Sequence, residues 1–518
     1  MLYLKKITTI AVVLITISST SAQQLKYDSV LTEITNHIKT KYIEPINIDS
    51  IINLMINEYL SQPETLQKIF AQLDPHSNYM NAEEYADLKT GLTGNFYGVG
   101  VVLSFIRDTV YIVRVFDGGP AQRSGLLPGD RIIAINDTSI TGEKANYDYV
   151  VKRLKGPKGT TVNIQLLRDN DQIQKFTCTR DQIDLKSVEA YFMQDKTTGY
   201  IKLTYFGETT TAEMQTALAA LKNMGMQKLI LDLRDNYGGL MRGALGVADE
   251  FISENKLLVY TEGYYFEREN YNASKPGLFE QGEMVVLINE YTASSGEILT
   301  GALQDNKRAT IIGKRSYGKG LVQNLYVLSD SVSALKLTTQ RYYTPSGKCI
   351  QRPFDDGTEA YFNDQKIAMK INGETPAIYK NNDWGIHPDI YYAEDTLFSN
   401  RLFTEFFYRS YFDQPANYYY AHHREEFKSF KNDDDFLNKY AVSNSLYATF
   451  YDFLIQQENK LEQSEKIVYT ESDITAIKNK IENALKANIA RGIWGDDAFF
   501  KILNVEDQEI TIAKKHLK

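Results

Sequence analysis

Tyr291-Thr292-Ala293-Ser294-Ser295-Gly296-Glu297 is the stretch that decides the fold, because it follows the apolar run Met284–Ile288 and opens a predicted helix. A second stretch, Ser316-Tyr317-Gly318-Lys319-Gly320, follows the apolar run Thr310–Gly313, and its lysine comes 25 residues after the serine at position 294. A serine at the start of a predicted helix therefore follows one predicted strand, and a lysine follows the next. This pattern is typical of a hydrolase that pairs a serine nucleophile with a lysine base.

The lysine is a candidate base because its surroundings favour a neutral amine. A lysine takes a proton from a serine only when it is uncharged, and burial in an apolar pocket lowers its pKa toward that state. Lys319 is flanked by Gly318 and Gly320, which allow close backbone approach. Gln323 offers an amide that can orient the ammonium nitrogen. Ser294, Lys319 and Gln323 are therefore the candidate catalytic residues.

An oxyanion hole is predicted beside the serine. Ser294 stands just before a predicted helix, where backbone N–H groups point at developing negative charge. The N–H of Ser295 is therefore one candidate donor. A second donor is expected from the glycine loop that follows the apolar strand ending at Leu233. Gly238 and Gly239 are both candidates, and the sequence does not choose between them.

Each of these signals also has a plainer structural interpretation. A serine at a helix start is usually an N-cap, and a lysine after a strand is usually a surface charge. Their combination with a glycine loop is what favours catalysis. The chain has no HExxH zinc motif, no GxSxG nucleophile elbow and no phosphate-binding loop. The pair His422-His423 is interpreted as a surface loop, so we expect no metal site and no cofactor.

Composition narrows the class of protein further. A chain of 518 residues is too long for one hydrophobic core, so several domains are expected. The 57 basic and 66 acidic residues give a formal charge of −9, which disfavours nucleic acid as a partner. Cys178 and Cys349 are too few for a disulfide framework and are expected to be separate buried thiols, with a single bridge as the alternative.

The first 22 residues are predicted to be an export signal. Lys5 and Lys6 precede the apolar segment Ile7–Ile17, and Thr20-Ser21-Ala22 provides small residues for cleavage. The apolar segment is shorter than the about 20 residues that a membrane span needs. We therefore expect a mature chain that starts near Gln23 and works in a periplasm, with an uncleaved anchor and membrane association as the alternative.

Periodicity and composition divide the rest of the chain into four parts. Residues 23–90 have apolar positions at helical spacing, residues 91–175 have glycines and short β-branched runs, and residues 395–518 are helical and aromatic. Residues 176–394 alternate strand and helix, which is typical of an α/β layer structure. The expected fold class is thus a multidomain α/β and β protein: an α/β core with an inserted β domain, an N-terminal helical segment and a C-terminal helical region.

Particular elements are predicted within these parts. The strands of the β domain are expected at Val99–Phe105, Val110–Val115, Arg131–Ile135 and Val162–Leu167, and its helices at Pro120–Ser124 and Asn146–Leu154. In the α/β core, strands are expected at Gly199–Leu203 and Lys228–Leu233, and helices at Thr211–Met224 and Leu240–Ile252. Helical spacing in the N-terminal segment links Ile34, Ile38 and Ile43, and later Ile51, Ile52, Met55, Ile56 and Leu60.

The C-terminal region has an aromatic stripe at helical spacing, which predicts core or an oligomer contact rather than a ligand site. It is formed by Phe403, Phe406, Phe407, Tyr411, Leu485 and Ile489. The acidic run Asp433-Asp434-Asp435 is interpreted as a solvated loop.

These motifs together resemble those of the carboxyl-terminal processing proteases, also called tail-specific proteases, whose members are Ser-Lys peptidases with a PDZ domain. Thr292–Ile298 resembles the family's nucleophile block, Gly318–Gln323 its lysine block and Leu231–Gly239 its oxyanion segment. Leu73–Met80, Arg341–Gly347 and Gly385–Asp389 also resemble family segments, so the similarity extends from about residue 28 to residue 390. It implies an endopeptidase with Ser294 as nucleophile, Lys319 as base and Gln323 as its partner. The family usually has alanine and serine where this chain has Ser295 and Gly296, so a second hydroxyl stands beside the predicted nucleophile.

The resemblance also implies that residues 91–175 form a PDZ domain. Backbone amides of Tyr97-Gly98-Val99-Gly100 are suited to bind a terminal carboxylate, and the strand from Val101 to Phe105 offers an edge. A peptide would add to this edge under the helix Asn146–Leu154. The predicted peptide-binding residues are Tyr97, Gly98, Val99, Gly100, Val101 and Val150.

The expected function is that of an exported serine endopeptidase that binds exposed C-terminal tails of proteins or peptides and cleaves them nearby. The alternative is a catalytically silent PDZ adaptor or scaffold. A homo-oligomer formed through residues 395–518 and an adaptor protein are left open.

Overall fold

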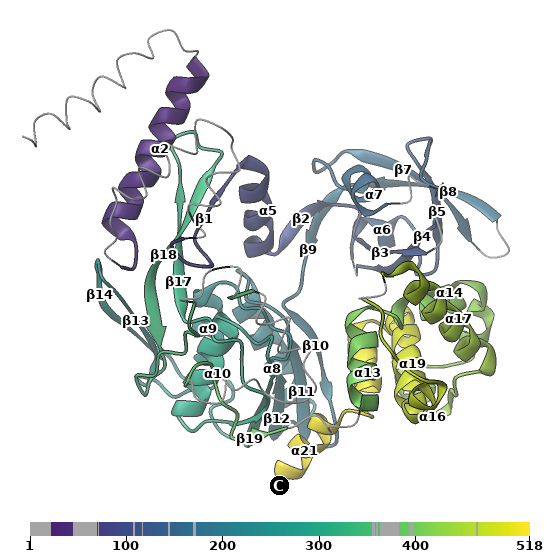
Figure 1. Ribbon diagram of the computed structural model, residues 1–518. Helices are drawn as coiled ribbons and strands as arrows, with labels where there is room; N and C mark the ends of the chain where they lie inside the picture. Colours follow the sequence, from purple (N-terminus) through teal and green to yellow (C-terminus); the bar gives the residue numbers. More distant parts are fainter. Residues whose placement is uncertain are drawn as a thin grey trace, which may run out of the picture. The chain divides into compact units, whose positions relative to one another are not determined.

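The computed structural model describes residues 22–44, 70, 72–106, 109–116, 118–142, 146–168, 172–354, 358, 361–362, 383–392, 398–462 and 465–517. The chain divides into two units by its contacts. Figure 1 labels the helices and strands of both. Unit 1 comprises residues 1–89, 257–272 and 318–385, and unit 2 comprises residues 90–256, 273–317 and 386–518. The predicted export signal and the apolar positions from Ile51 to Leu60 lie outside the described residues.

Unit 1 is built on an antiparallel sheet with a long helix packed beside it. The strand order is β1-β18-β13-β14, with β17 also paired to β18. These strands are β1 (Asn78–Met80), β13 (Leu257–Gly263), β14 (Phe266–Asn272), β17 (Leu321–Val327) and β18 (Ala334–Tyr343). Helix α2 (Ala22–Lys41) buries Ile34 and Ile38 in one cluster with Leu335 and Leu337 of β18, as its apolar spacing predicts. Helix α5 (Ala82–Thr93) follows β1.

Unit 2 contains a six-stranded sheet in the order β10-β11-β12-β15-β16-β19. The strands are β10 (Val188–Met193), β11 (Thr198–Leu203), β12 (Lys228–Asp232), β15 (Met284–Ile288), β16 (Thr310–Gly313) and β19 (Ile390–Tyr391). β10 is antiparallel to β11 and the remaining pairs are parallel. The connecting helices are α8 (Thr210–Asn223), α9 (Met241–Ala248) and α10 (Ser295–Asp305). The parallel order confirms the predicted α/β core.

Helix α9 is shorter than the predicted Leu240–Ile252. The two acidic residues that follow it take tertiary hydrogen bonds instead of continuing the helix. Asp249 accepts from the N–H and the hydroxyl of Ser274, and the buried Glu250 accepts from the N–H of Leu278. The helical pattern therefore predicted the element but not its end.

The β domain of unit 2 is a five-stranded sheet in the order β3-β4-β5-β7-β8, with the short β6 paired to β5. Its elements are β3 (Val101–Ile106), β4 (Thr109–Val115), α6 (Pro120–Arg123), β5 (Arg131–Ile135), β6 (Thr138–Ser139), α7 (Tyr147–Leu154), β7 (Thr161–Arg168) and β8 (Gln172–Thr179). A separate pair, β2 (Asn95–Gly98) and β9 (Asp181–Asp184), flanks it. These elements match the predicted strands and helices, and Asn146 caps α7 by accepting from the N–H of Tyr149.

The C-terminal region is helical, as predicted. It contains α13 (Phe398–Tyr408), α14 (Asp413–His422), α15 (Arg424–Phe427), α16 (Asp433–Lys439), α17 (Asn444–Lys460), α18 (Glu471–Ala476), α19 (Lys478–Trp494), α20 (Asp496–Leu503) and α21 (Gln508–His516). Phe406, Tyr411, Leu485 and Ile489 lie in its core, which confirms the core interpretation of the aromatic stripe. The acidic run from Asp433 is not a loop. It is the first turn of α16, where acidic side chains suit the helix dipole.

Helices of the C-terminal region complete the large sheet of unit 2. Ile510, Ala513 and Leu517 share a buried cluster with sheet residues such as Tyr200 and Val285. The sheet therefore depends on α21 to cover an apolar face. The region also contacts the β domain, where Arg114 of β4 pairs with Asp496 and Arg424 donates to the carbonyl of Pro128.

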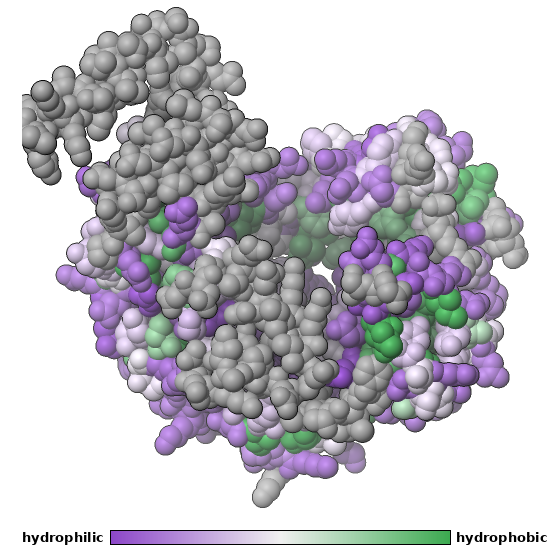
Figure 2. Space-filling model, in the orientation of Figure 1, coloured by the Kyte–Doolittle hydropathy of each residue, from purple (hydrophilic) through white to green (hydrophobic). Residues whose placement is uncertain are grey.

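On the face shown in Figure 2, hydrophilic side chains cover much of the described surface and smaller hydrophobic patches lie between them. Within the described ranges, no helix is both long and apolar enough to span a bilayer. Cys178 is a buried free thiol and Cys349 is a half-buried free thiol.

Candidate active site

Ser294 lies where the sequence predicts, at the end of the loop that joins β15 to α10. It is the N-cap of α10 and has a φ of +53°, a left-handed conformation that is unusual for a residue with a side chain. Its N–H donates to Oε2 of Glu297 at 2.8 Å, and Glu297 is fully buried. The other carboxylate oxygen of Glu297 accepts from the hydroxyl of Ser316. One buried carboxylate thus holds the strained backbone of Ser294.

The loop after β12 is joined to the Ser294 loop through Asn236. The carbonyl of Asn236 accepts from the N–H of Ala293, and its side-chain amide donates to the carbonyl of Leu203, both at 2.9 Å. A Cβ added at Gly238 would lie only 2.8 Å from Cβ of Ser294. Only glycine fits there, so the predicted glycine loop passes directly against the predicted nucleophile.

A second set of hydrogen bonds joins the same two loops farther from the serine. Asn289 and Asp235 exchange bonds, because the Asp235 N–H donates to the Asn289 side chain at 3.0 Å and Asn289 Nδ2 donates back to Asp235 Oδ1 at 2.9 Å. The hydroxyl of the buried Thr292 donates to the carbonyl of Leu233 at 2.8 Å. The two loops therefore form one hydrogen-bonded frame around Ser294.

The adjacent hydroxyl of Ser295 is already engaged. Ser295 is 1% exposed and its Oγ donates to the carbonyl of Gly239 at 2.9 Å, whereas Ser294 is half-buried. The Gly238 N–H donates to Asn236 Oδ1 at 2.9 Å. Gly239 forms a parallel bridge with Phe206, in which the Phe206 N–H donates to the Gly238 carbonyl and the Phe206 carbonyl accepts from the Leu240 N–H. The N–H and carbonyl of Gly239 take no part in these two ladder bonds, and the carbonyl accepts from Ser295 instead.

Lys319 belongs to unit 1 and lies in a segment held by its backbone. The N–H of Arg352 donates to the carbonyl of Gly318, and the N–H of Tyr342 donates to the carbonyl of Gly320, both at 2.9 Å. Gly318 has a φ of +84°, and a Cβ there would meet the Trp384 ring at 2.6 Å. The glycine before the lysine is thus required by both backbone conformation and space. Lys319 itself is half-buried.

Gln323 connects to a buried polar chain in unit 1. Its Nε2 donates to Thr338 Oγ1 at 3.1 Å, and the Thr338 hydroxyl donates to Asp74 Oδ1 at 2.9 Å. Asp74 also accepts from the hydroxyl and the N–H of Ser77. The segment Leu73–Met80 thereby stabilises the position of the Gln323 side chain through Thr338.

Three cations lie near the half-buried His76 in the same unit. Burial lowers the pKa of His76 strongly, and the charges of Lys319, Lys336 and Arg352 lower it further. The imidazole is therefore neutral at physiological pH, and its Nε2 lies 3.2 Å from the hydroxyl of Tyr361.

The structure brings Ser294, Ser295, Gly238 and Gly239 together in unit 2 and places Lys319 and Gln323 in unit 1. The pairing of serine with lysine remains a prediction. The sequence argument missed Glu297, although the spacing Ser-x-x-Glu at a helix start is the signal of a capping box. It also missed Asn289 and Asp235, for which no local pattern exists.

The β domain contains the predicted peptide-binding elements. β3 is the terminal strand of its sheet, so one of its edges has no partner strand within the described sheet. The carbonyl of Leu154, the last residue of α7, lies 3.5 Å from a Cβ added at Gly98. Val99, Val150 and Leu154 are buried together, Val101 is half-buried beside them, and Tyr97 is 45% exposed. This arrangement suits addition of a peptide strand between β3 and α7.

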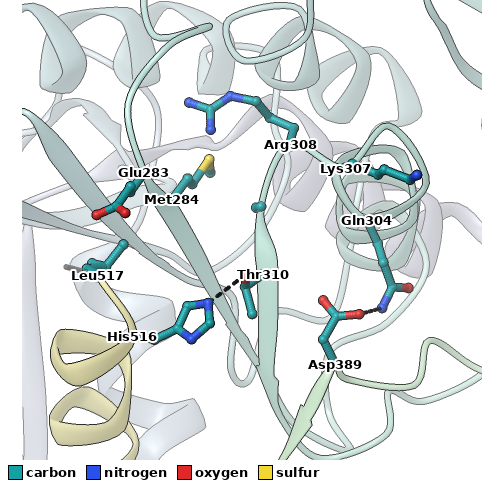
Figure 3. Close-up of a pocket in the computed structure, with 10 residues that line it drawn as sticks. Glu283, Met284, Gln304, Lys307, Arg308, Thr310, Asp389, His516 and Leu517 are labelled. Atoms are coloured by element: carbon teal, nitrogen blue, oxygen red, sulfur yellow. Dashed lines mark hydrogen bonds between the residues drawn. The ribbon is translucent and has the colours of Figure 1, made fainter.

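A cavity of about 410 Å³ lies at a different edge of the large sheet (Figure 3). It is lined by the first residues of β15 and β16, Met284 and Thr310, whereas Ser294 follows the opposite end of β15. His516 Nε2 lies 3.0 Å from the Thr310 hydroxyl there, and Gln304 donates to Asp389. The cavity is therefore separate from the serine. In the described ranges, no group of three or more His, Cys, Asp or Glu side chains is placed to hold a metal ion.

Three family models match the chain. The model of peptidase family S41 matches residues 197–359, which contain Ser294 and Lys319. The PDZ domain model matches residues 98–177, so the β domain is a PDZ domain. Residues 402–495 match a family of unknown function (DUF8443).

Similar proteins carry related names. A carboxy-terminal-processing protease of Bartonella bacilliformis is 32% identical over 329 residues, covering 61% of this chain and 75% of that protein. A carboxyl-terminal-processing protease of Synechocystis is 35% identical over 294 residues, covering 55% of this chain and 68% of that protein. The solved photosystem II D1 C-terminal processing protease is 24% identical, has a TM-score of 0.42, and covers 72% of this chain and 94% of that chain.

Proposed function

Because the chain belongs to the carboxyl-terminal processing proteases of peptidase family S41, we propose that this serine-type peptidase cleaves proteins with a Ser294–Lys319 dyad. The observation that carries the proposal is the frame around Ser294, in which a strained backbone holds the serine against a glycine loop. Ser294 is the nucleophile rather than Ser295, because the Ser295 hydroxyl is buried and bonded to Gly239.

The first step forms an acyl-enzyme. Neutral Lys319 takes the proton of the Ser294 hydroxyl while Oγ attacks the carbonyl carbon of the scissile peptide bond. The negative charge on the carbonyl oxygen is stabilised by backbone N–H groups. Ser295 and Gly239 supply these donors in our proposal, since the Gly238 N–H is already bonded to Asn236. The lysine then gives its proton to the leaving amine.

The second step releases the product. A water molecule attacks the acyl carbon, Lys319 takes one of its protons, and Ser294 leaves with a proton and regains its hydroxyl. Gln323 orients the lysine amine, and its own amide is held by Thr338. The chain itself limits the distance between base and nucleophile. Lys319 follows Tyr317 by only two residues, and the Tyr317 N–H donates to the carbonyl of Thr292 at 2.9 Å.

Tail recognition belongs to the PDZ domain in this proposal. The backbone from Tyr97 to Gly100 binds the terminal carboxylate, and the chain before it adds to the edge of β3. Val150 faces the buried cluster where the last apolar side chain of the tail would enter. The substrates would then be proteins or peptides with exposed, apolar C-terminal tails.

A peptide with an apolar tail, made once with a free carboxylate and once as the amide, tests both claims. Wild-type protein should cleave the free acid with a kcat/KM at least about tenfold above that of the amide, since the amide loses a charge-assisted hydrogen bond. Ser294→Ala and Lys319→Ala should each abolish cleavage of both. Equal rates for acid and amide would contradict tail recognition. Full cleavage by Ser294→Ala would contradict the catalytic assignment, and binding without cleavage by the wild type would favour the adaptor alternative.

We further propose that the protein works outside the cytoplasm, on the strength of the charged and apolar pattern in its first 22 residues. Sequencing the N-terminus of protein purified from a periplasmic fraction tests this. A chain that starts near Gln23 supports export with cleavage, and an intact Met1 in the cytoplasmic fraction contradicts it.

A further inference from the structure

The C-terminal region contacts the glycine loop, residues Asp235–Gly239, at its first residue. The hydroxyl of Tyr408, the last residue of α13, donates to Asp235 Oδ1 at 3.1 Å. The same oxygen accepts from Asn289 Nδ2 at 2.9 Å. A residue separated from Asp235 by 173 positions in the sequence therefore shares its carboxylate with the frame around Ser294.

Asp235 has a backbone conformation that needs support from neighbouring side chains. Its φ of +61° is left-handed, which costs energy for a residue with a side chain and persists only where the surroundings enforce it. The bonds from Asn289 and Tyr408 provide that enforcement. Asp235 also begins the turn that carries Gly238 against Ser294, so a change in its conformation moves the proposed oxyanion donors.

A second contact from the same region fixes the preceding residue. Arg234 donates to Glu509 of α21 at 2.6 Å and pairs with Asp507 at 2.8 Å. Its other guanidinium nitrogens bind Asp232, the last residue of β12. Arg234 joins β12 to the loop. Its guanidinium group is therefore bonded both to the end of β12 and to the C-terminal region.

Tyr408 is placed so that its hydroxyl can act separately from its ring. Its ring centroid lies 5.3 Å from that of Tyr291, and the residue as a whole is 48% exposed. Removing only the hydroxyl therefore keeps the ring contact and opens no buried cavity. Such a variant changes one hydrogen bond to Asp235 and little else.

We propose that Tyr408 is a positioning residue for peptide hydrolysis: its hydroxyl holds Asp235, and through it the glycine loop that supplies an oxyanion donor. This assigns a role in catalysis to the C-terminal region, and it rests on the proposed function of Ser294. An oxyanion hole stabilises the transition state only if its donors are fixed before the reaction begins. Loosening the loop should therefore reduce kcat and leave substrate binding unchanged.

Tyr408→Phe tests this in the full-length protein, with Tyr411→Phe as the matched control. The Tyr411 hydroxyl donates to Glu458 at 2.8 Å, inside the C-terminal region and away from the loop. We expect Tyr408→Phe to lower kcat about threefold to tenfold with KM unchanged, as loss of one hydrogen bond allows. Tyr411→Phe should lower the melting temperature at least as much and keep the wild-type kcat. A peptide boronate should bind Tyr408→Phe more weakly by the same factor, because its tetrahedral oxygen occupies the oxyanion hole.

The outcomes separate this inference from the proposed function. If wild-type protein cleaves peptide, Ser294→Ala does not, and Tyr408→Phe keeps full kcat, the role of Tyr408 is wrong and the dyad stands. Equal losses of kcat in Tyr408→Phe and Tyr411→Phe would also overturn it, because general loosening would explain both. Wild-type protein without any Ser294-dependent cleavage would overturn both proposals.

Discussion

The segments that carry Ser294 and Lys319 are held in different ways. The serine segment is fixed by buried polar side chains, since Glu297, Asn236 and Asn289 all bond to backbone groups of the two loops. The lysine segment is fixed by backbone hydrogen bonds, by the Gln351 side chain that accepts from the Gly320 N–H, and by close packing at Gly318. A nucleophile beside an oxyanion hole needs exact hydrogen-bond geometry, whereas a lysine base needs a tight, water-poor environment. The serine side should therefore be sensitive to lost hydrogen bonds and the lysine side to added volume.

The largest effect is expected from added volume on the lysine side. Gly318→Ala places a methyl group 2.6 Å from the Trp384 ring in a left-handed conformation. The segment must shift, and a displacement of about 1 Å can cost roughly 100-fold in rate. Peptide cleavage measures this loss. Gly225→Ala is the control, because Gly225 has a φ of +96° with nothing within 4 Å of an added Cβ. It should lose about 1 kcal/mol of stability and no activity, and an equally active Gly318→Ala would contradict the packing argument.

A smaller but still large effect is expected from a lost carboxylate on the serine side. Glu297→Ala leaves the N–H of Ser294 and the hydroxyl of Ser316 without their acceptor in a buried site. Each unsatisfied group costs about 1–3 kcal/mol, and relaxation of the strained serine should lower kcat by roughly 10- to 50-fold. Chemical denaturation and steady-state kinetics measure the two effects. Loss of stability with an unchanged kcat would show that the serine conformation does not depend on Glu297.

Gln323 is the exception on the lysine side, because it is held by a polar chain through Thr338 to Asp74. Gln323→Ala removes the amide that we propose orients the lysine, and about a fivefold loss of kcat is expected from one such bond. Thr338→Val should produce part of the same loss by freeing the Gln323 side chain. A Gln323→Ala enzyme with full kcat across the pH range would show that Gln323 does not orient the lysine.

The smallest effect on activity is expected from Glu509, whose contribution is to stability. Burial raises its pKa from about 4.5 to about 7, the carboxylates of Asp507 and Asp232 raise it too, and Arg234 opposes them. The folded protein therefore binds a proton between these values that the unfolded chain releases, and the contribution of Glu509 to stability is lost as pH rises from about 5 to about 8. Glu509→Gln lacks this proton. The difference in free energy of unfolding, variant minus wild type, should therefore increase by roughly 1–3 kcal/mol as pH rises over that range. A constant difference across pH, measured by denaturation, would contradict the raised pKa.

Much of this contrast was predictable from local sequence. The apolar run Met284–Ile288 and the helix behind it placed Ser294 at the right junction, because a buried strand and an N-cap are local patterns. The helix predicted at Asn146–Leu154 and the strands of the PDZ domain followed for the same reason. The aromatic stripe of the C-terminal region predicted its core correctly.

The errors and omissions have physical causes as well. The acidic run at Asp433 was interpreted as a loop, although the same charges stabilise the start of α16. The bond between Tyr408 and Asp235 depends on how distant segments pack, and no spacing in the sequence encodes it. The same holds for Asn289, which acts only because its strand lies beside β12.

The most direct test of the central claim is to identify the serine that a fluorophosphonate probe modifies. Such a probe forms a bond between phosphorus and an activated serine oxygen, and fluoride leaves. Tandem mass spectrometry distinguishes Ser294 from Ser295 within one peptide. The account predicts a single adduct on Ser294 in the wild type and none in Lys319→Ala. An adduct on Ser295, or labelling of Lys319→Ala at the wild-type rate, would contradict it.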